Sequence, residues 1–167
     1  MLRISSVVVH QADVERQVHR LARRSESELL SLNSDMRSRV RHVLTRLQGR
    51  GWRPVVFHGR RTAVQQAEKV RLGYSPTMNS FHVAGTQLHH DRNGMNWDVK
   101  GEAADIVDAR YLWAGPAESL HFQFWNDLGW IAESLGLTWG GRWKKPDVAH
   151  VELTSREFTQ DTRGLVA

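Results

Sequence analysis

The chain contains no cysteine and no long apolar stretch, and these two absences exclude several kinds of protein. Without cysteine, disulfide bonds, thiolate metal sites and a cysteine nucleophile are excluded, so histidine and carboxylate side chains would have to bind any metal ion. No run approaches the roughly 18 apolar residues of a membrane-spanning helix. The apolar part of the opening segment MLRISSVVVHQ is too short for a signal-peptide core. We therefore expect a protein made in the cytoplasm without a signal peptide.

Positive charge is concentrated in the N-terminal third. Residues 1–53 contain 11 arginines and 5 acidic residues, a net charge of +6, whereas the other 114 residues contain 12 basic and 13 acidic residues, a net charge of −1. Such a segment could face nucleic acid, anionic lipid or an anionic cell-wall polymer. A solvated helix face explains the pattern equally well. No groove-reading element such as a helix-turn-helix is evident, so no specific nucleic-acid partner is expected.

Hydrophobic periodicity predicts a single α+β domain. There is no repeat, low-complexity tract or Gly/Pro/Ser-rich linker, and 167 residues suit one core. Because helices come first and strands are scattered, we expect a small, mainly antiparallel sheet flanked by helices. The expected helices start at Asp13, at Asn33 or Ser34, at the Thr62–Gln65 capping box and after Pro116, and the expected strands cover 53–58, 103–109 and 147–153.

The segment GEAADIVD at 101–108 places two aspartates in an apolar strand. A buried carboxylate such as that of Asp105 is costly unless a cation or a donor pairs with it. His150 lies on the strand 147–153, on the same face as Glu152, and Asp147 precedes it by three residues. Two histidines and one carboxylate can hold zinc with a fourth position open for water. A chain with nine histidines and 18 acidic residues offers many such trios, so composition alone does not identify the site.

The residue patterns of three segments, and their order along the chain, identify the candidate site more specifically than composition does. SFH at 80–82 followed by GEAADIVD at 101–108 resembles an S-x-H-x-x-G-x-A-x-D pattern, and WGGRWKKPDVAHVEL at 139–153 resembles W-G-G-x-W…D-x-x-H-[FV]-E. Upstream, GRRTAVQQAEKVRLG at 59–73 is similar to G-x-R-S/T-x-x-x-Q. These are patterns of the zinc D-alanyl-D-alanine carboxypeptidases and L-alanyl-D-glutamate endopeptidases, which include phage endolysins. The resemblance covers residues 33–153 as a family-like core and leaves 1–32 as a basic, helical N-terminal extension.

The resemblance implies a role for each matching residue. One zinc ion would be bound at the sheet by His82, Asp105 and His150, with Asp147 as the general base. Arg61 would stabilise the substrate carbonyl or the developing oxyanion, and it would also bind substrate together with Gln66, Ser80 and Trp139. Glu152 could orient His150 from behind, although a plain surface acid fits its position as well. Trp139 and Trp143 could both line the substrate cleft, although packing is the commoner role for tryptophan in a chain that has seven.

One departure from the family pattern concerns spacing. The family usually places the first His and Asp ligands seven positions apart, whereas 23 positions separate His82 from Asp105. The extra residues, 83–100, have the polar, NG-containing composition of an inserted loop. Such an insertion need not move either ligand, because loop-closure entropy rises slowly with length. It leaves open whether His89 or His90 is a ligand instead, and whether Gly85 rather than Gly101 is the motif glycine.

The function that the resemblance implies is zinc-dependent hydrolysis of peptidoglycan stem peptides, at either a D-Ala–D-Ala or an L-Ala–D-Glu bond. A phage or prophage endolysin that acts at the cell wall or in the periplasm after release would fit. Its partner would be peptidoglycan, and the N-terminal third could also touch an anionic envelope surface. The alternative is a non-catalytic basic module that binds cell wall or nucleic acid.

Overall fold

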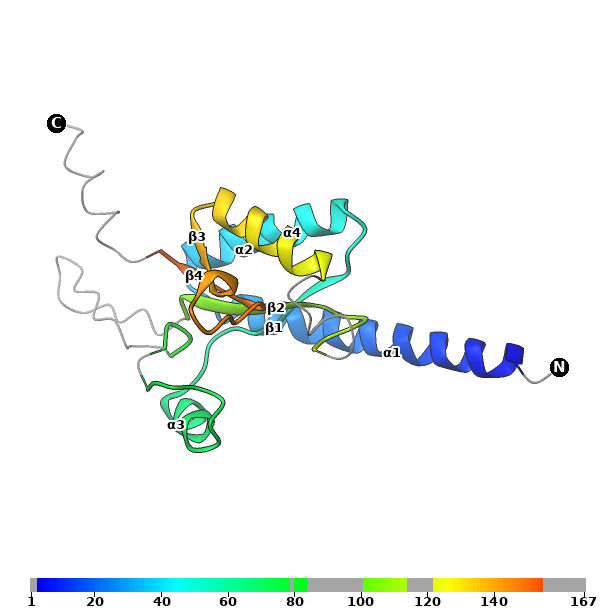
Figure 1. Cartoon of the computed structure of the whole chain (residues 1–167), viewed down its shortest axis with the longest axis horizontal. Coiled ribbons are helices and arrows are strands. Elements are labelled where there is room, and N and C mark those ends of the chain that lie inside the picture. The colour runs from blue at the N-terminus through cyan, green and yellow to red at the C-terminus, as the bar shows by residue number, and fades with distance from the viewer. Residues whose placement is uncertain (1–2, 79, 84–100, 114–121, 155–167) are drawn as a thin grey trace.

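The computed structural model describes residues 3–78, 80–83, 101–113 and 122–154. Four strands form one antiparallel sheet in the order β1-β2-β4-β3, and the described helices surround it. In Figure 1, α2 and α4 lie above the sheet and α3 lies below it, set apart from the other helices. The α+β class with a small antiparallel sheet is therefore confirmed. The elements are α1 (Arg3–Leu30), α2 (Ser34–Gly49), β1 (Pro54–His58), α3 (Ala63–Arg71), β2 (Ala103–Asp108), α4 (Gln123–Ser134), β3 (Leu137–Trp139), the short 3-10 helix η2 (Gly140–Arg142) and β4 (His150–Leu153).

Local capping signals in the sequence determine where two helices begin. The side chain of Asn33 accepts a hydrogen bond from the Met36 amide at 2.8 Å and starts α2. Thr62 and Gln65 form the expected reciprocal capping box at the start of α3. The chain leaves α3 just before Gly73, which has a positive φ of 77°.

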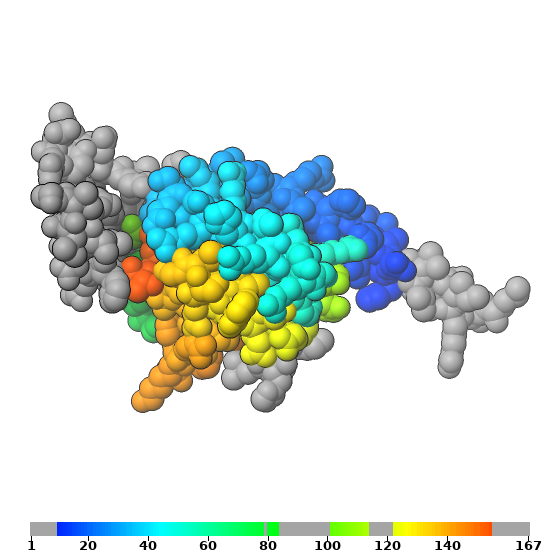
Figure 2. Space-filling view, turned by 90° about the horizontal axis from the view of Figure 1, so that it is seen from above, coloured from blue at the N-terminus to red at the C-terminus, as the bar shows by residue number. Residues whose placement is uncertain are grey.

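The core lies between the sheet and the helices α1, α2 and α4. The apolar stripe expected on α2 is buried at Met36, Val40, Val43 and Leu47, and α2 packs against α4. Figure 2 shows these two helices meeting on one face of the molecule. All six residues of β2 are buried, so this strand is covered on both faces.

Helix α1 is longer than the sequence indicated and is part of the core. It begins at Arg3 rather than Asp13, and Leu21 and Leu29 belong to the main apolar cluster. Ser25 Oγ accepts a hydrogen bond from the Val56 amide of β1 at 2.8 Å. The helix runs along the sheet, and its N-terminal part extends beyond it (Figure 1). The second half of α1 thus contributes to the packing of β1.

Several arginines of the basic third form ion pairs with acidic residues of α1 and α2, within one helix or between the two. Arg24 pairs with Glu28, Arg39 with Asp35 and Arg41 with Glu26. These pairs use part of the local positive charge, and contact with an anionic envelope surface stays a prediction. Among the described helices, none combines the length and the apolarity that crossing a membrane requires.

The remaining differences from the sequence expectations have simple causes. Strand β3 was not expected, because three residues are too few to show a period of two. Helix α4 begins at Gln123, and the start expected at Pro116 lies outside the described residues. The expected insertion at 83–100, apart from Val83, and with it His89 and His90, also lies outside them.

The second aspartate of GEAADIVD, Asp108, has a structural role at the end of β2. Its side chain is fully buried and pairs with Arg110 Nη2 at 2.7 Å. The backbone amides of Arg53 and Arg110 also donate to it, at 2.8 Å and 2.9 Å. Burial alone would raise the pKa of Asp108, but the Arg110 guanidinium and these amides outweigh burial and lower it.

We expect Asp108→Ala to lower the free energy of unfolding by about 3 kcal/mol at pH 7, because it leaves buried donors and a guanidinium without a partner. The matched control is Asp13→Ala, which removes the exposed pair with Arg16 and should cost less than about 1 kcal/mol. The pKa of Asp108 is lowered in the folded state, so its contribution is present above the ordinary Asp pKa of about 3.9 and is lost as the pH falls further. Urea unfolding of both variants at pH 7 and pH 3 measures this. Equal losses in the two variants would contradict the assignment.

Candidate metal centre and cleft

His82, Asp105 and His150 come together in the structure. One ligand atom from each lies within 4.8 Å of the others, and all three residues are buried. Asp105 and His150 face each other directly in the register of the antiparallel strands β2 and β4. The segment 80–83 brings His82 to them: the His82 carbonyl accepts a hydrogen bond from the Arg61 amide at 2.7 Å, and the Phe81 carbonyl accepts one from the Glu102 amide at 2.9 Å.

Hydrogen bonds on the outer side of each imidazole determine which nitrogen faces the cluster. His82 Nδ1 lies 2.6 Å from the Gly59 carbonyl, so it carries the proton and leaves Nε2 as the inward atom. His150 Nε2 lies 2.9 Å from the Glu152 carboxylate, which leaves Nδ1 facing inward. The two inward nitrogens are 3.2 Å apart and lie 3.2 Å and 3.3 Å from Asp105 Oδ1. Two imidazole nitrogens and a carboxylate oxygen at this separation need a proton or a metal cation between them. Burial alone would lower the pKa of His150, but the Asp105 and Glu152 carboxylates outweigh burial and raise it to about 9, so a proton can hold the cluster together. With both imidazoles neutral, the same three atoms form a donor set that fits a divalent metal ion.

The other oxygen of Asp105 also has cationic or donor neighbours. His58 Nδ1 lies 3.3 Å from Asp105 Oδ2, and Arg61 Nη2 lies 3.6 Å from it. Burial by itself would raise the pKa of Asp105, but the imidazoles of His82, His150 and His58 reverse this and lower it well below its ordinary value. Asp105 is thus the charged centre around which the cluster is arranged.

His58 also belongs to the cluster, although the sequence did not single it out. This residue ends β1, and its partner in the register with β2 is Asp105. The available signal was a histidine at the end of the strand expected at 53–58, but without the strand pairing nothing connected it to Asp105. His58 holds the carboxylate from the side opposite His82 and His150.

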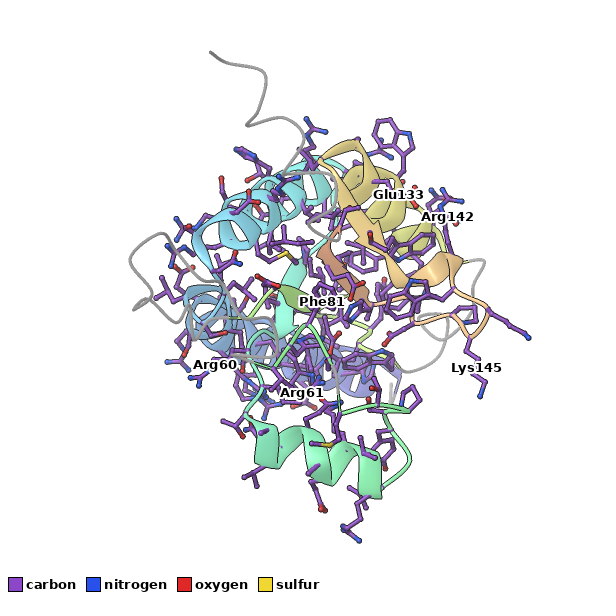
Figure 3. All side chains as sticks on the ribbon, turned by 90° about the vertical axis from the view of Figure 1, so that its left-hand side faces the viewer. Arg60, Arg61, Phe81, Glu133, Arg142 and Lys145 are labelled. Atoms are coloured by element: carbon purple, nitrogen blue, oxygen red, sulfur yellow. The ribbon has the colours of Figure 1, made fainter. Side chains whose placement is uncertain are left out.

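Arg61 and Gln66 form a connected pair below the sheet. Arg61 is buried, and its Nη1 donates to Gln66 Oε1 at 2.7 Å. The amide nitrogen of Gln66 donates to Ser75 Oγ at 2.8 Å and to the Thr77 carbonyl at 2.6 Å. Burial lowers the pKa of Arg61 while Asp105 and Asp147 act in the opposite direction. Figure 3 shows Arg61 between α3 and the sheet.

Asp147 lies at the rim of the cluster on the turn that precedes β4. Its amide donates to the Gly140 carbonyl at 3.0 Å, and its carbonyl accepts from the His150 amide at 3.2 Å. A Cβ at Gly140 would lie 2.6 Å from the Asp147 carbonyl oxygen, so this close approach requires glycine. The residue stays accessible to solvent, yet surrounding protein atoms and the Asp105 carboxylate raise the pKa of Asp147 against the opposing effect of His150 and His82. A carboxyl group in this position is suited to accept and return a proton.

A cleft of about 310 Å³ opens above the cluster. One side comes from the end of α3 and the following segment, and the other from the turn between η2 and β4. Ser80 lies in its wall, and the Trp143 ring stands 5.0 Å from the His150 ring. The lining comprises Arg61, Lys69, Tyr74, Ser75, Pro76, Thr77, Ser80, Phe81, His82, Asp105, Trp143, Asp147, His150 and Glu152.

Two residues expected to bind substrate lie outside this lining. Trp139 packs between Gly129 and Gly141, where added Cβ atoms would lie 2.3 Å and 2.1 Å from its ring. Its indole N–H donates to the Val148 carbonyl at 2.9 Å, so the side chain supports the turn instead of the cleft. Gln66 is fully buried and acts on the site indirectly, by holding Arg61, Ser75 and the Thr77 carbonyl in place. Trp143 is the tryptophan of this segment that faces the cleft.

Comparisons with known proteins agree with this geometry. No family model matches the chain. The L-alanyl-D-glutamate peptidase of Listeria phage A118 is 27% identical over 142 residues, which cover 84% of this chain and 44% of that protein. The chain thus spans less than half the length of this curated relative.

The fold is also similar to that of a peptidase whose structure has been solved. The Serratia marcescens L-Ala D-Glu endopeptidase ChiX superposes with a TM-score of 0.53 and 25% identity, covering 82% of this chain and 91% of that one. In sequence and in fold, the chain resembles the L-alanyl-D-glutamate peptidases, the family group that its three motifs indicated.

Proposed function

We propose that the chain is a metal-dependent peptidase that hydrolyses peptidoglycan stem peptides, with the L-Ala–D-Glu bond as its target. The observation that carries the proposal is the convergence of His82, Asp105 and His150 at the floor of a cleft that also contains Asp147 and Arg61. The two similar proteins, a phage L-alanyl-D-glutamate peptidase and the Serratia endopeptidase, favour this bond over D-Ala–D-Ala.

In this proposal His82 Nε2, His150 Nδ1 and Asp105 Oδ1 bind one zinc ion. Bound zinc supplies Lewis-acid polarisation of a carbonyl and lowers the pKa of water towards about 7. Glu152 and the Gly59 carbonyl hold the imidazoles in the tautomers that the ion requires. His58 and Arg61 hold the far oxygen of Asp105.

The chain's own residues then provide proton transfer and charge stabilisation. Asp147 accepts the proton of the attacking water and returns it to the departing amine of D-Glu. Arg61 stabilises the negative charge that develops on the carbonyl oxygen, an interaction that strengthens towards the transition state. Ser80 and Trp143 line the path of the peptide on either side. The biological role we propose is lysis of a host cell by a phage or prophage enzyme acting at the cell wall.

Digestion of purified peptidoglycan followed by mass spectrometry tests the proposed function. We expect freed stem peptides that begin with D-Glu, and we expect them to disappear with a chelator and return on adding zinc. Release of free D-Ala would instead identify a carboxypeptidase. If no metal-dependent product forms, the chain is not a peptidase of this kind.

The ligand set predicts a specific pattern of metal loss. His150→Ala and Asp105→Ala should lose nearly all bound zinc, because each removes one of three protein ligands. His42→Ala, on the exposed face of α2, is the control and should bind zinc like the parent, as should the double variant His89→Ala/His90→Ala. Inductively coupled plasma mass spectrometry of the dialysed proteins measures their zinc content. Zinc loss in the double variant would move the ligand assignment into the 83–100 segment.

Because Asp147 is proposed to act in proton transfer and not as a metal ligand, replacing it should lower catalysis without reducing zinc binding. Asp147→Asn should lower kcat by about 100- to 10,000-fold, the usual contribution of a general base, while zinc content and folding remain at the parent's level. Asp35→Asn, which alters an exposed pair with Arg39, should leave kcat unchanged. Retention of full activity in Asp147→Asn would remove this residue from the mechanism.

A further inference from the structure

Lys69 is a second cation in the cleft, and the proposed chemistry gives it no role. It lies in the last turn of α3, is half-buried, and lines the cleft together with Arg61. Lys69 follows the buried Gln66 by three residues, so the two share one face of the helix. Gln66 anchors that face through Arg61, Ser75 and the Thr77 carbonyl.

The backbone around Lys69 is also held in place. Its carbonyl accepts hydrogen bonds from the amides of Tyr74 and Ser75, at 2.8 Å and 3.2 Å. The chain therefore folds back over the end of α3 and keeps the lysine at the cleft wall. This wall faces the turn that carries Trp143 and Asp147.

Three of the nearby carboxylates are engaged with other partners. Glu68, the acidic residue of α3, pairs with Arg71 at 2.6 Å on the exposed side of the helix. Glu152 is bonded to His150, and Asp105 lies among imidazoles and Arg61. Within the described ranges, no carboxylate forms an ion pair with the Lys69 ammonium, so this charge remains available to a ligand in the cleft.

Arg61 cannot supply the same function. Its guanidinium is buried, with Nη1 on Gln66 and Nη2 beside Asp105. These contacts fix it near the proposed reaction centre, where it serves the carbonyl oxygen. A separate negative group of the substrate needs a separate cation, and Lys69 lies eight residues further along the chain, in the last turn of α3, where it lines the same cleft.

The chemistry of the stem peptide supplies such a group. D-Glu continues the stem peptide through its γ-carboxyl group, so its α-carboxylate is free and sits next to the amine that leaves. We infer that Lys69 determines specificity by pairing with this α-carboxylate, an inference that rests on the proposed function. An ammonium at the cleft wall is a suitable partner, since a charged pair in a sheltered site contributes more than one on an open surface.

The test compares two disaccharide tetrapeptides that differ at one group, the α-carboxyl of D-Glu, which is free in one and amidated in the other. The parent should prefer the free acid by about tenfold to a hundredfold in kcat/KM, the usual effect of one charge-assisted contact. Lys69→Met should abolish this preference, mainly through a higher KM for the acid, and should cleave the amide as the parent does. Lys69→Arg, which keeps the charge, should retain most of the preference.

Lys145→Met is the matched control, because Lys145 points away from the body into solvent (Figure 3). It should keep the parent's preference, and all variants should have the parent's thermal midpoint and zinc content. The inference is overturned if Lys69→Met prefers the free acid as strongly as the parent, or if the parent shows no preference. A parent that cleaves neither peptide would instead refute the proposed function.

Discussion

The arrangement of the site depends on the buried carboxylate of Asp105. In a strand covered on both faces, an unpaired negative charge would cost several kcal/mol. The protein offsets this cost by surrounding the group: His82 and His150 approach one oxygen, and His58 and Arg61 approach the other. These neighbours come from β1, β4 and the segments beside α3. The antiparallel register of β1, β2 and β4 is therefore what brings the donors together, and it places two inward imidazole nitrogens where a divalent ion fits.

The segment from 139 to 153 builds the opposite wall by close packing of backbone and glycine. Trp139 fills the space between Gly129 and Gly141, and its indole N–H holds the Val148 carbonyl. Gly140 lets the Asp147 turn approach closely enough for a 3.0 Å hydrogen bond between their backbones. The first tryptophan of this segment thus supports the turn, and the turn presents Asp147 and Trp143 to the cleft. On the other wall, Gln66 has the corresponding supporting role for Arg61 and, through α3, for Lys69.

The likeness to two peptidases and the geometry of the cleft both support the proposed function. The Serratia endopeptidase shares the fold over most of both chains, whereas the phage peptidase is more than twice as long as the region it shares with this chain. What the structure adds is the distribution of charge in the cleft: a buried guanidinium next to the metal ligands and a half-buried ammonium further along. A substrate with a negative group beside the departing amine complements that distribution.

Patterns among residues close together in the sequence were sufficient to predict much of the fold. The apolar spacing of α2, the Asn33 cap, the Thr62–Gln65 capping box and the alternation of β4 are all local, because they depend on neighbours within one or two turns. Strand β3 was not predicted, because its three residues are too few to show the alternation of apolar and polar residues typical of a strand. The length of α1 and its place in the core depend on contacts with β1, which lies more than 20 residues further along the chain.

For the candidate site, the sequence by itself determined which residue types were available: without cysteine, a metal centre must use imidazole and carboxylate, and the motif order selected His82, Asp105 and His150. Only the tertiary structure decided that these three converge, that His58 joins them, and that Trp143 rather than Trp139 faces the cleft. The physical reason is strand pairing. Partners 45 and 47 residues apart in the chain become neighbours through a register that no local pattern encodes.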